Sequence, residues 1–170
     1  MTGGCEAEEN IFDNDLALVE QCVQKLRLLH NSPQEDISHL LDYLNGFYAN
    51  PKTSVRFKIV YEVSRFACPE SVALLTRALI EDESPLVRHE AASGLGEIGD
   101  LTVIPILVNF GLRDSSPIVR HEAAMALDSI GDETVLLDLR RCLSDEDPIV
   151  VASCEVAISS ILFRKGQSQS

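Results

Sequence analysis

Two His-Glu doublets occupy the same position in two similar stretches of the chain. His89-Glu90 follows the string Pro-Leu-Val-Arg, and His121-Glu122 follows Pro-Ile-Val-Arg. Imidazole and carboxylate groups without a thiolate suit a transition metal of the iron or manganese type better than a structural zinc. Adjacent residues on a helix lie about 100° apart, so one doublet cannot hold an ion alone. The doublets therefore indicate a candidate metal site in which ligands from neighbouring helices converge.

A structural explanation of the doublets stays open beside the metal site. The copies of a repeat resemble one another, so both doublets could descend from a single exposed surface pair. A Glu in the first turn of a helix is also favoured by the helix macrodipole. The arginines that precede the doublets, Arg88 and Arg120, are expected to be structural and to bond to acidic neighbours such as Glu81, Asp82 and Asp114.

The remaining histidines and the cysteines give no second candidate site. His30 and His39 have no partner at a ligand spacing, so we expect them at the surface or in a helix cap. The five cysteines form no CxxC pair, and their number is odd in a chain that shows no export signal. We expect Cys22, Cys142 and Cys154 to be small core residues in the reduced form.

The elements that must position the doublets are copies of one repeated unit. Residues 84–100 recur as residues 116–132, a shift of 32 residues, and divergent copies start near Ser54 and Pro148. A fixed period of this length is the signature of a solenoid. The sequence therefore predicts about four repeats of 31–32 residues.

Each copy predicts two helices. Val87, Ala91 and Leu95 recur at steps of four and form one apolar stripe with Ile98. Proline suits the first turn of such a helix, and glycine suits the left-handed position after its last turn. These positions are taken by Pro85, Pro117, Gly99 and Gly131. A second apolar face is formed by Val103, Ile104, Leu107, Val108 and Leu112. The fold class is therefore all-α, a HEAT-like helical-hairpin solenoid.

The position of each doublet on its helix predicts which way it points. His89 lies about 200° around the helix from the core residue Ala91, so it should project from the solvent-facing surface of the stack. Equivalent helices of a solenoid pack about 8 to 10 Å apart, which allows two imidazoles to converge on one ion. Glu90 should lie nearer the flank of the same face.

Three segments make up the predicted domain organisation. Residues 1–14 form an acidic flexible N-terminus, residues 15–163 the solenoid domain, and residues 164–170 a disordered polar tail. The solenoid includes an extra N-terminal helix over residues 16–29, while residues 37–47 form the first helix of the first copy.

The composition describes one globular domain with an acidic surface. The chain has 170 residues, 45% of them apolar, and its 14 Lys and Arg against 27 Asp and Glu give a net charge of −13. Such a surface repels phosphate backbones and favours a basic protein partner. No run approaches the roughly 20 apolar residues of a membrane span, and the acidic start lacks the features of a signal peptide. We expect a cytoplasmic protein that binds neither nucleic acid nor membrane.

The repeated strings resemble the HEAT-like repeats of the deoxyhypusine hydroxylase family. The likeness rests on the Pro-Leu-Val-Arg-His-Glu-Ala and Pro-Ile-Val-Arg-His-Glu-Ala strings and on the Leu-Gly-Glu-Ile-Gly-Asp that follows the first; it runs from about Ile37 to Leu162. Generic HEAT-like repeats, such as those of phycobilin lyases, share the Val-Arg and Ile-Gly-Asp signals but usually lack Glu after His at both places. The two doublets in the middle copies of four resemble one half of a deoxyhypusine hydroxylase.

The resemblance implies an enzyme, a metal and a substrate. Members of the family are iron-dependent peptidyl deoxyhypusine monooxygenases of hypusine biosynthesis, which hold two irons with four His-Glu pairs and use molecular oxygen. Their substrate is a deoxyhypusine side chain on a eukaryotic translation factor, which would be the basic partner. The positions that match iron ligands are His89, Glu90, His121 and Glu122.

The chain departs from the family in two respects. It carries two doublets where the family uses four, and Ala91-Ala92-Ser93-Gly94 replaces the bulkier, Tyr-containing sequence typical after the first doublet. Two copies associated as a C2 homodimer would bring four His and four Glu together, so this homodimer is the expected active form. The alternative is a non-catalytic HEAT-repeat protein-binding scaffold or pseudoenzyme. A third possibility is a chaperone that resembles the bilin lyases.

Overall fold

The computed structural model shows a stack of helical hairpins. It describes residues 52–167 and, before them, only Ala17, residues 19–21, Gln24, Leu44, Gly46, Tyr48 and Ala49. Every regular element over residues 52–167 is a helix, which confirms the predicted all-α solenoid. The acidic segment 1–14 and most of the helices expected over residues 16–29 and 37–47 lie outside the described residues.

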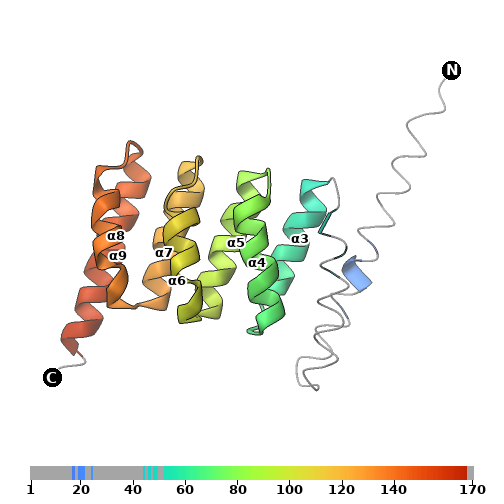
Figure 1. The fold of residues 1–170 in the computed structure, drawn as a ribbon, viewed down its shortest axis with the longest axis horizontal. Coiled ribbons are helices and arrows are strands. Elements are labelled where there is room, and N and C mark those ends of the chain that lie inside the picture. The colour runs from blue at the N-terminus through green and yellow to red at the C-terminus, as the bar shows by residue number, and fades with distance from the viewer. Residues whose placement is uncertain are drawn as a thin grey trace.

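Two layers of helices make up the described stack (Figure 1). The first layer consists of α3 (Thr53–Val63), α5 (Pro85–Ile98), α7 (Pro117–Ile130) and α9 (Pro148–Gln167), and each of these helices contacts the next. The second layer consists of α4 (Pro69–Glu81), α6 (Ile104–Ile106) and α8 (Leu136–Arg141). Short 3-10 turns, η1 (Leu101–Val103), η3 (Glu133–Val135) and η4 (Cys142–Ser144), flank α6 and α8.

The helices of the first layer begin and end where the sequence predicts. Pro85 opens α5 and Pro117 opens α7, at a position where the missing N–H costs no helical hydrogen bond. Gly99 and Gly131 follow these helices with φ of 70° and 75°, the left-handed conformation that glycine adopts without strain. The doublets are therefore held near the start of two helices of equal length.

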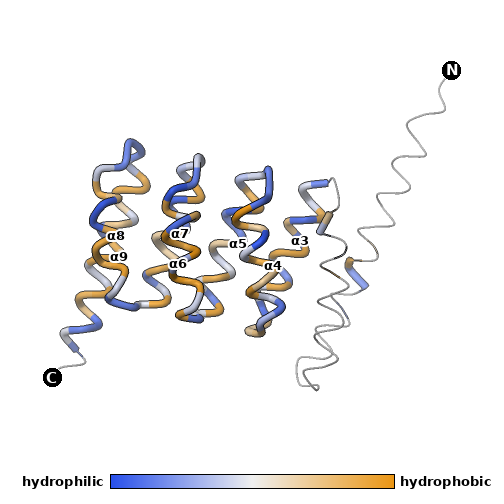
Figure 2. The backbone as a smooth tube through the Cα atoms, viewed as in Figure 1, coloured by the Kyte–Doolittle hydropathy of each residue, from blue (hydrophilic) through white to orange (hydrophobic). Residues whose placement is uncertain are grey.

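The core lies between the two layers. Val87, Ala91 and Leu95 on α5 are fully buried, as are their equivalents Val119, Ala123 and Leu127 on α7. Hydrophobic stretches alternate with hydrophilic ones along the stack, and the hydrophilic residues gather where helices join (Figure 2). The doublets lie outside the buried apolar stripe of α5 and α7.

The helix predicted from Val103 to Leu112 is interrupted, although the apolar residues along it recur regularly. After α6 the chain widens into a π turn, η2 (Leu107–Gly111), and the Leu112 amide donates to the Leu107 carbonyl over 2.8 Å. Gly111 lies directly against α7, because a Cβ atom placed on it would be 2.6 Å from the Cβ of Ala123. Glycine thus permits a close approach between the two layers here.

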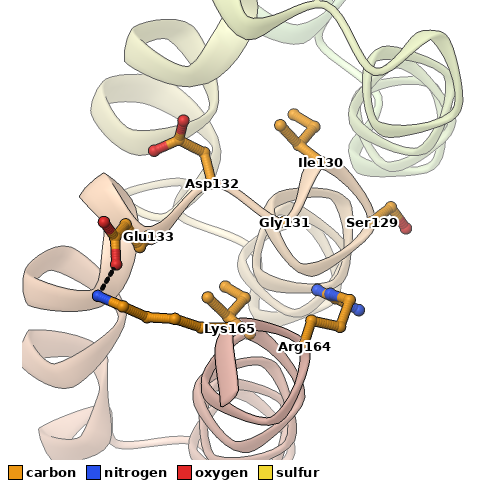
Figure 3. Close-up of a pocket in the computed structure, with 8 residues that line it drawn as sticks. Ser129, Ile130, Gly131, Asp132, Glu133, Arg164 and Lys165 are labelled. Carbon is orange, nitrogen blue, oxygen red and sulfur yellow. Dashed lines mark hydrogen bonds and ion pairs between the residues drawn. The ribbon is translucent and has the colours of Figure 1, made fainter. Parts of the chain in front are cut away.

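Residues 164–167 are helical, so the prediction of a disordered tail from Arg164 is wrong for these residues. Arg164 donates to Asp128 over 2.6 Å, and Lys165 pairs with Glu133 (Figure 3). Both cations also lie in the last turn of α9, where the helix dipole favours positive charge. The remaining tail, residues 168–170, lies outside the described part of the chain. None of the helices in the described part is long and apolar enough to cross a membrane.

Candidate metal site

Both doublets lie on first-layer helices, outside the buried apolar stripe. His89 and Glu90 stand in the second turn of α5, and His121 and Glu122 stand at the same place on α7. All four are only partly buried, whereas the alanines that follow them are fully buried. The doublets are therefore accessible to solvent only in part, and Nδ1 of His89 is buried.

His89 contacts the second residue of the other doublet. Its Nε2 lies 3.2 Å from Oε2 of Glu122, and the two side chains are 30% and 17% exposed. The hydrogen bond to Glu122 raises the pKa of His89 above its ordinary value. The same bond lowers the pKa of Glu122, with a smaller contribution from a hydrogen bond to Ser93. Two groups on α5 thus hold a carboxylate that belongs to α7.

The separation of these two atoms suits a shared cation. Two ligand atoms that each lie about 2.1 Å from an ion, at a right angle, are about 3 Å apart. The 3.2 Å between His89 Nε2 and Glu122 Oε2 is close to that spacing. A metal would replace the proton that now lies between them, because the ligand form of His is the neutral ring with a free lone pair.

His121 is oriented by Ser153 of the next copy. Nδ1 of His121 lies 2.6 Å from Oγ of Ser153, and the Ser153 hydroxyl is also 2.6 Å from the carbonyl oxygen of Ile149. A carbonyl only accepts, so the single hydroxyl proton goes to Ile149 and the serine oxygen accepts from His121. Nδ1 therefore carries the proton, and in the neutral ring Nε2 presents its lone pair, as a metal ligand must.

Glu90 lies in an electrostatic environment that favours a nearby cation. Burial raises its pKa, and the neighbouring carboxylates Glu97 and Glu122 raise it further, against an opposing contribution from His89. Like charges held close together are costly unless a positive charge lies between them. The chemistry of the donor set therefore fits a divalent metal.

The described residues do not complete a metal site by themselves. No group of three or more His, Cys, Asp or Glu side chains is gathered around one point within the described part of the chain. Each His meets the residue at the Glu position of the next copy, which is Glu122 for His89 and Ser153 for His121. Within the described part of the chain, the doublets therefore make separate two-residue contacts rather than one gathered set of ligands.

The arginines before the doublets have the structural role that the sequence predicts. Each Arg of one copy forms an ion pair with an Asp in the turn before the following first-layer helix. The pairs are Arg56 with Asp82 at 2.8 Å, Arg88 with Asp114 at 2.7 Å and Arg120 with Asp145 at 2.8 Å. We call this series the Arg-Asp ladder. It fixes the spacing of α5, α7 and α9 and hence of the doublets.

An aliphatic row flanks the doublets on the same face. Leu86, Ile118 and Ile149 stand one helical turn before the doublets of α5 and α7 and before the equivalent position of α9. Their side chains are 52%, 42% and 48% exposed. We call these three residues the aliphatic row. Exposed apolar side chains that recur at each repeat form a surface suited to protein contact.

Ser153 and Ser93, which hold the doublets, were not predicted. The sequence contains a signal for Ser153, since the 31-residue shift to the last copy places it at the position of Glu122. Ser93 carries no such signal, because its contact with Glu122 depends on how closely α5 and α7 pack.

Comparison with known proteins identifies the repeats. The family model of HEAT repeats matches residues 37–111 and 110–161, which together span most of the chain. The chain belongs to the HEAT-repeat family. The repeated units found in the sequence over these ranges are therefore HEAT repeats.

This HEAT-repeat chain is distantly similar to deoxyhypusine hydroxylases, which confirms the resemblance expected from the two doublet strings. It is 33% identical over 101 residues to the deoxyhypusine hydroxylase of Schizosaccharomyces pombe and 30% identical over 99 residues to that of Aspergillus clavatus. These matches cover 59% and 56% of the chain and 30% of each relative. The chain thus spans about a third of the curated relatives it matches.

Two solved structures resemble the fold. Human deoxyhypusine hydroxylase in complex with glycerol superposes with a TM-score of 0.70 at 31% identity, over 77% of this chain and 46% of that one. The complex of CpcE and CpcF of phycocyanin lyase from Nostoc sp. PCC7120 gives 0.63 at 18% identity, over 83% of this chain and 98% of that one. The second likeness concerns the HEAT fold alone.

Proposed function

We propose that this chain catalyses an iron-dependent hydroxylation of the deoxyhypusine type, on a modified lysine side chain of a eukaryotic translation factor. The observation that carries the proposal is the contact of His89 with Glu122 across neighbouring helices. It places an imidazole nitrogen and a carboxylate oxygen at a spacing that two ligands of one ion adopt. The similarity to deoxyhypusine hydroxylases supports the same reading.

The residues proposed to hold iron are His89, Glu90, His121 and Glu122. His121 presents Nε2 because Ser153 holds its proton on Nδ1, and Ser93 helps to hold the Glu122 carboxylate in place. Iron bound there would supply the activation of molecular oxygen that hydroxylation requires. The side chains of this protein would hold the metal, orient the substrate amine and limit the access of water.

The proposal requires a second copy of the chain. One copy offers two doublets on an open face, and an isologous pair would bring four doublets together around two irons. The aliphatic row lies one turn from the doublets, so two such faces in contact would bury Leu86, Ile118 and Ile149 next to the metals. Iron would also neutralise the carboxylates that meet across this contact.

The charge of the chain suits the proposed substrate. A net charge of −13 attracts a basic protein that carries a cationic amine side chain. Long-range attraction of this kind raises the rate of encounter more than it raises affinity. Glu90 and Glu97 contribute negative charge at the doublet face itself.

Metal analysis combined with light scattering tests the proposal. The protein, loaded anaerobically with ferrous iron, should bind about one iron per chain, become dimeric and hydroxylate a deoxyhypusine-containing translation factor in air. His89→Ala and His121→Ala should lose iron, dimer and activity, while the matched control Ser129→Ala on the same helix layer keeps all three. A protein that takes up no iron and stays monomeric contradicts the proposal.

A non-catalytic scaffold is the second candidate function. The exposed aliphatic row favours it, because a row of this kind serves a protein partner without any metal. In that case the His89→Ala and His121→Ala variants would bind the translation factor as well as the unmodified chain does, and no hydroxylation would be detected in any of them.

A further inference from the structure

The outer side of α9, at the end of the described stack, corresponds to a side that α5 and α7 cover with the next helix (Figure 1). On α5, His89 contacts Glu122, and a Cβ atom placed on Gly96 would lie 2.7 Å from the Cβ of Ala126. Both contacts join α5 to the next first-layer helix. In the described part of the chain, no helix follows α9 in this way.

The repeat register identifies the residues of this outer side. A shift of 32 residues leads from α5 to α7, and a shift of 31 residues leads from α7 to α9. The residues of α5 that face α7 therefore have equivalents on α9, and all of these equivalents are exposed. Together with two exposed residues of the following turn, they form what we call the end face: Ala152, Glu155, Val156, Ser159, Leu162 and Phe163.

Apolar side chains make up much of the end face. Val156 is 54% exposed, Leu162 44% and Phe163 69%. Because α9 has 20 residues, whereas α5 and α7 have 14 and end before a left-handed glycine, its last turns lengthen the face. At the open end of a solenoid a polar outer side keeps the protein soluble, so apolar side chains gathered there indicate a contact surface.

Glu155 lies in the middle of the end face. It takes the position of Ala92 and Ala124, which are fully buried in the two preceding first-layer helices. Within residues 52–167, no ion pair involves Glu155. A carboxylate enclosed between two helices is costly unless a cation pairs with it. A helix that covers α9 must therefore bring a Lys or Arg to Glu155.

The charge of the chain favours a different, basic protein over a second copy at this face. Two copies with a net charge of −13 each repel one another. At the doublets, iron would offset such repulsion, but α9 has Ala152-Ser153 in place of a doublet. Two end faces in contact would also add the Glu155 carboxylates of both copies.

We propose that the end face binds a basic amphipathic helix of another protein, which takes the place of the next first-layer helix. Its apolar residues cover Val156, Leu162 and Phe163, and a Lys or Arg pairs with Glu155. Helices in such contacts pack about 8 to 10 Å apart. This binding is separate from the doublets and needs neither iron nor the proposed hydroxylation.

The contact of α7 with α5 shows where the cation of the partner stands. Glu122 of α7 bonds to His89 and Ser93 of α5. The equivalents of these two α5 residues stand three positions before Glu155 and one position after it. A Lys in the place of Glu122 would therefore lie next to the Glu155 carboxylate.

Two stapled peptides provide the probe. Both carry residues 117–130, the sequence of α7, held helical by a hydrocarbon staple on the solvent side; one keeps Glu122 and the other has Glu122→Lys. Fluorescence anisotropy measures their binding to the metal-free full chain. Because close charge pairs at interfaces contribute strongly, the Lys peptide should bind about 10-fold more tightly than the Glu peptide, or better.

A charge exchange makes the test specific. Glu155→Lys should reverse the preference, so that the Glu peptide binds more tightly than the Lys peptide. Glu146→Lys is the matched control, because it makes the same change of charge at a turn residue that is 92% exposed, and it should keep the preference of the unmodified chain. The double variant Val156→Ser with Phe163→Ser should weaken the binding of both peptides while circular dichroism shows an unchanged fold.

Three results would overturn the proposal. The first is that neither peptide binds the unmodified chain. The second is that Glu155→Lys and Glu146→Lys change the preference equally, which would show a general effect of charge. The third is that the metal-free chain associates with itself in sedimentation velocity and that Phe163→Ser abolishes this association, which would assign the end face to a second copy.

Discussion

Nε2 of His89 on α5 lies 3.2 Å from Oε2 of Glu122 on α7, so the two doublets are joined across the repeat boundary. Each histidine reaches forward to the next copy rather than to the residue beside it in sequence. His121 does the same with Ser153, where the last copy has a hydroxyl in place of a carboxylate. His89 therefore contacts a carboxylate and His121 contacts a hydroxyl, although the two helices that carry these histidines, α5 and α7, are alike.

The His89-Glu122 contact predicts the titration of His89 in the metal-free protein. Glu122→Gln removes the carboxylate, so the pKa of His89 should fall from its raised value toward the ordinary value of about 6.5. NMR titration of the imidazole resonances measures the change. Glu97→Gln, on the same helix as His89, is the control and should leave the pKa of His89 unchanged. A His89 pKa that is equal in both variants would show that the contact does not form in solution.

The same pair predicts a window of pH in which it stabilises the fold. The folded-state pKa of His89 is raised, so its contribution is present at low pH and is lost as the pH rises through that value. The folded-state pKa of Glu122 is lowered, so its contribution is lost as the pH falls through that value. The unmodified chain and Glu122→Gln should therefore differ most in unfolding free energy at a pH that lies between the folded-state pKa values of Glu122 and His89.

The hydrogen bond of Ser153 predicts an effect on metal affinity. Ser153→Ala removes the acceptor that keeps the His121 proton on Nδ1, so Nε2 is no longer selected as the free nitrogen. Loss of such a supporting bond costs about 10- to 100-fold in metal affinity. Competition with a chelator measures the ferrous affinity, and Ser129→Ala is the matched control. Equal affinities in the two variants would leave Ser153 without a role in metal binding.

The aliphatic row predicts where two copies meet. Ile118→Lys places a charge at the centre of the row and should abolish the iron-dependent dimer while the monomer stays folded, because the side chain is already exposed. Sedimentation velocity with and without ferrous iron measures the change. Leu137→Lys, at a more exposed aliphatic residue of the second layer, should still dimerise. If both variants dimerise, the contact surface lies elsewhere.

The Arg-Asp ladder predicts a large loss of stability from a single substitution. Arg120→Met leaves the Asp145 carboxylate without its bidentate partner and should lower the unfolding free energy by about 3 kcal/mol. Arg140→Met, at an exposed arginine, should change it by less than about 0.5 kcal/mol. The pKa of Asp145 is lowered by Arg120, so the difference between the unmodified chain and Arg120→Met should shrink in acid. Urea unfolding at neutral and acidic pH gives both results.

The buried stripe predicts the cost of a cavity without an effect on the metal ligands. Leu127→Ala removes a fully buried side chain and should cost on the order of 2 to 5 kcal/mol. Leu137→Ala, on the exposed side of α8, should cost less than about 0.5 kcal/mol. Iron binding by the folded fraction of Leu127→Ala should match that of the unmodified chain. A loss of iron binding at constant fold would place Leu127 in the support of the site.

The sequence predicts the fold well where the same residue types recur at the same positions of each repeat. Proline at the start, glycine at the end and an apolar stripe between them determine α5 and α7 almost to the residue. The π turn at Leu107–Gly111 could not be read in this way, because it depends on how closely the two layers approach at Ala123. The helical turn around Arg164 likewise depends on a tertiary contact, the bond to Asp128.

The sequence predicts only part of the candidate site. The doublets and their exposed face follow from spacing and helical geometry. Which nitrogen of each ring is free does not, because it depends on Glu122 for His89 and on Ser153 for His121.

The turns closed by the Arg-Asp ladder should be unusually slow to exchange their amide protons with water. In each turn the aspartate accepts both from an arginine and from a backbone amide two residues later, at 2.8 Å for Ser84 and Ser116 and 2.9 Å for Asp147. These amides can open only when the ladder breaks, so their exchange would report the joints between repeats. The connecting segments of this stack would then be as well protected from deuterium as the helices they join.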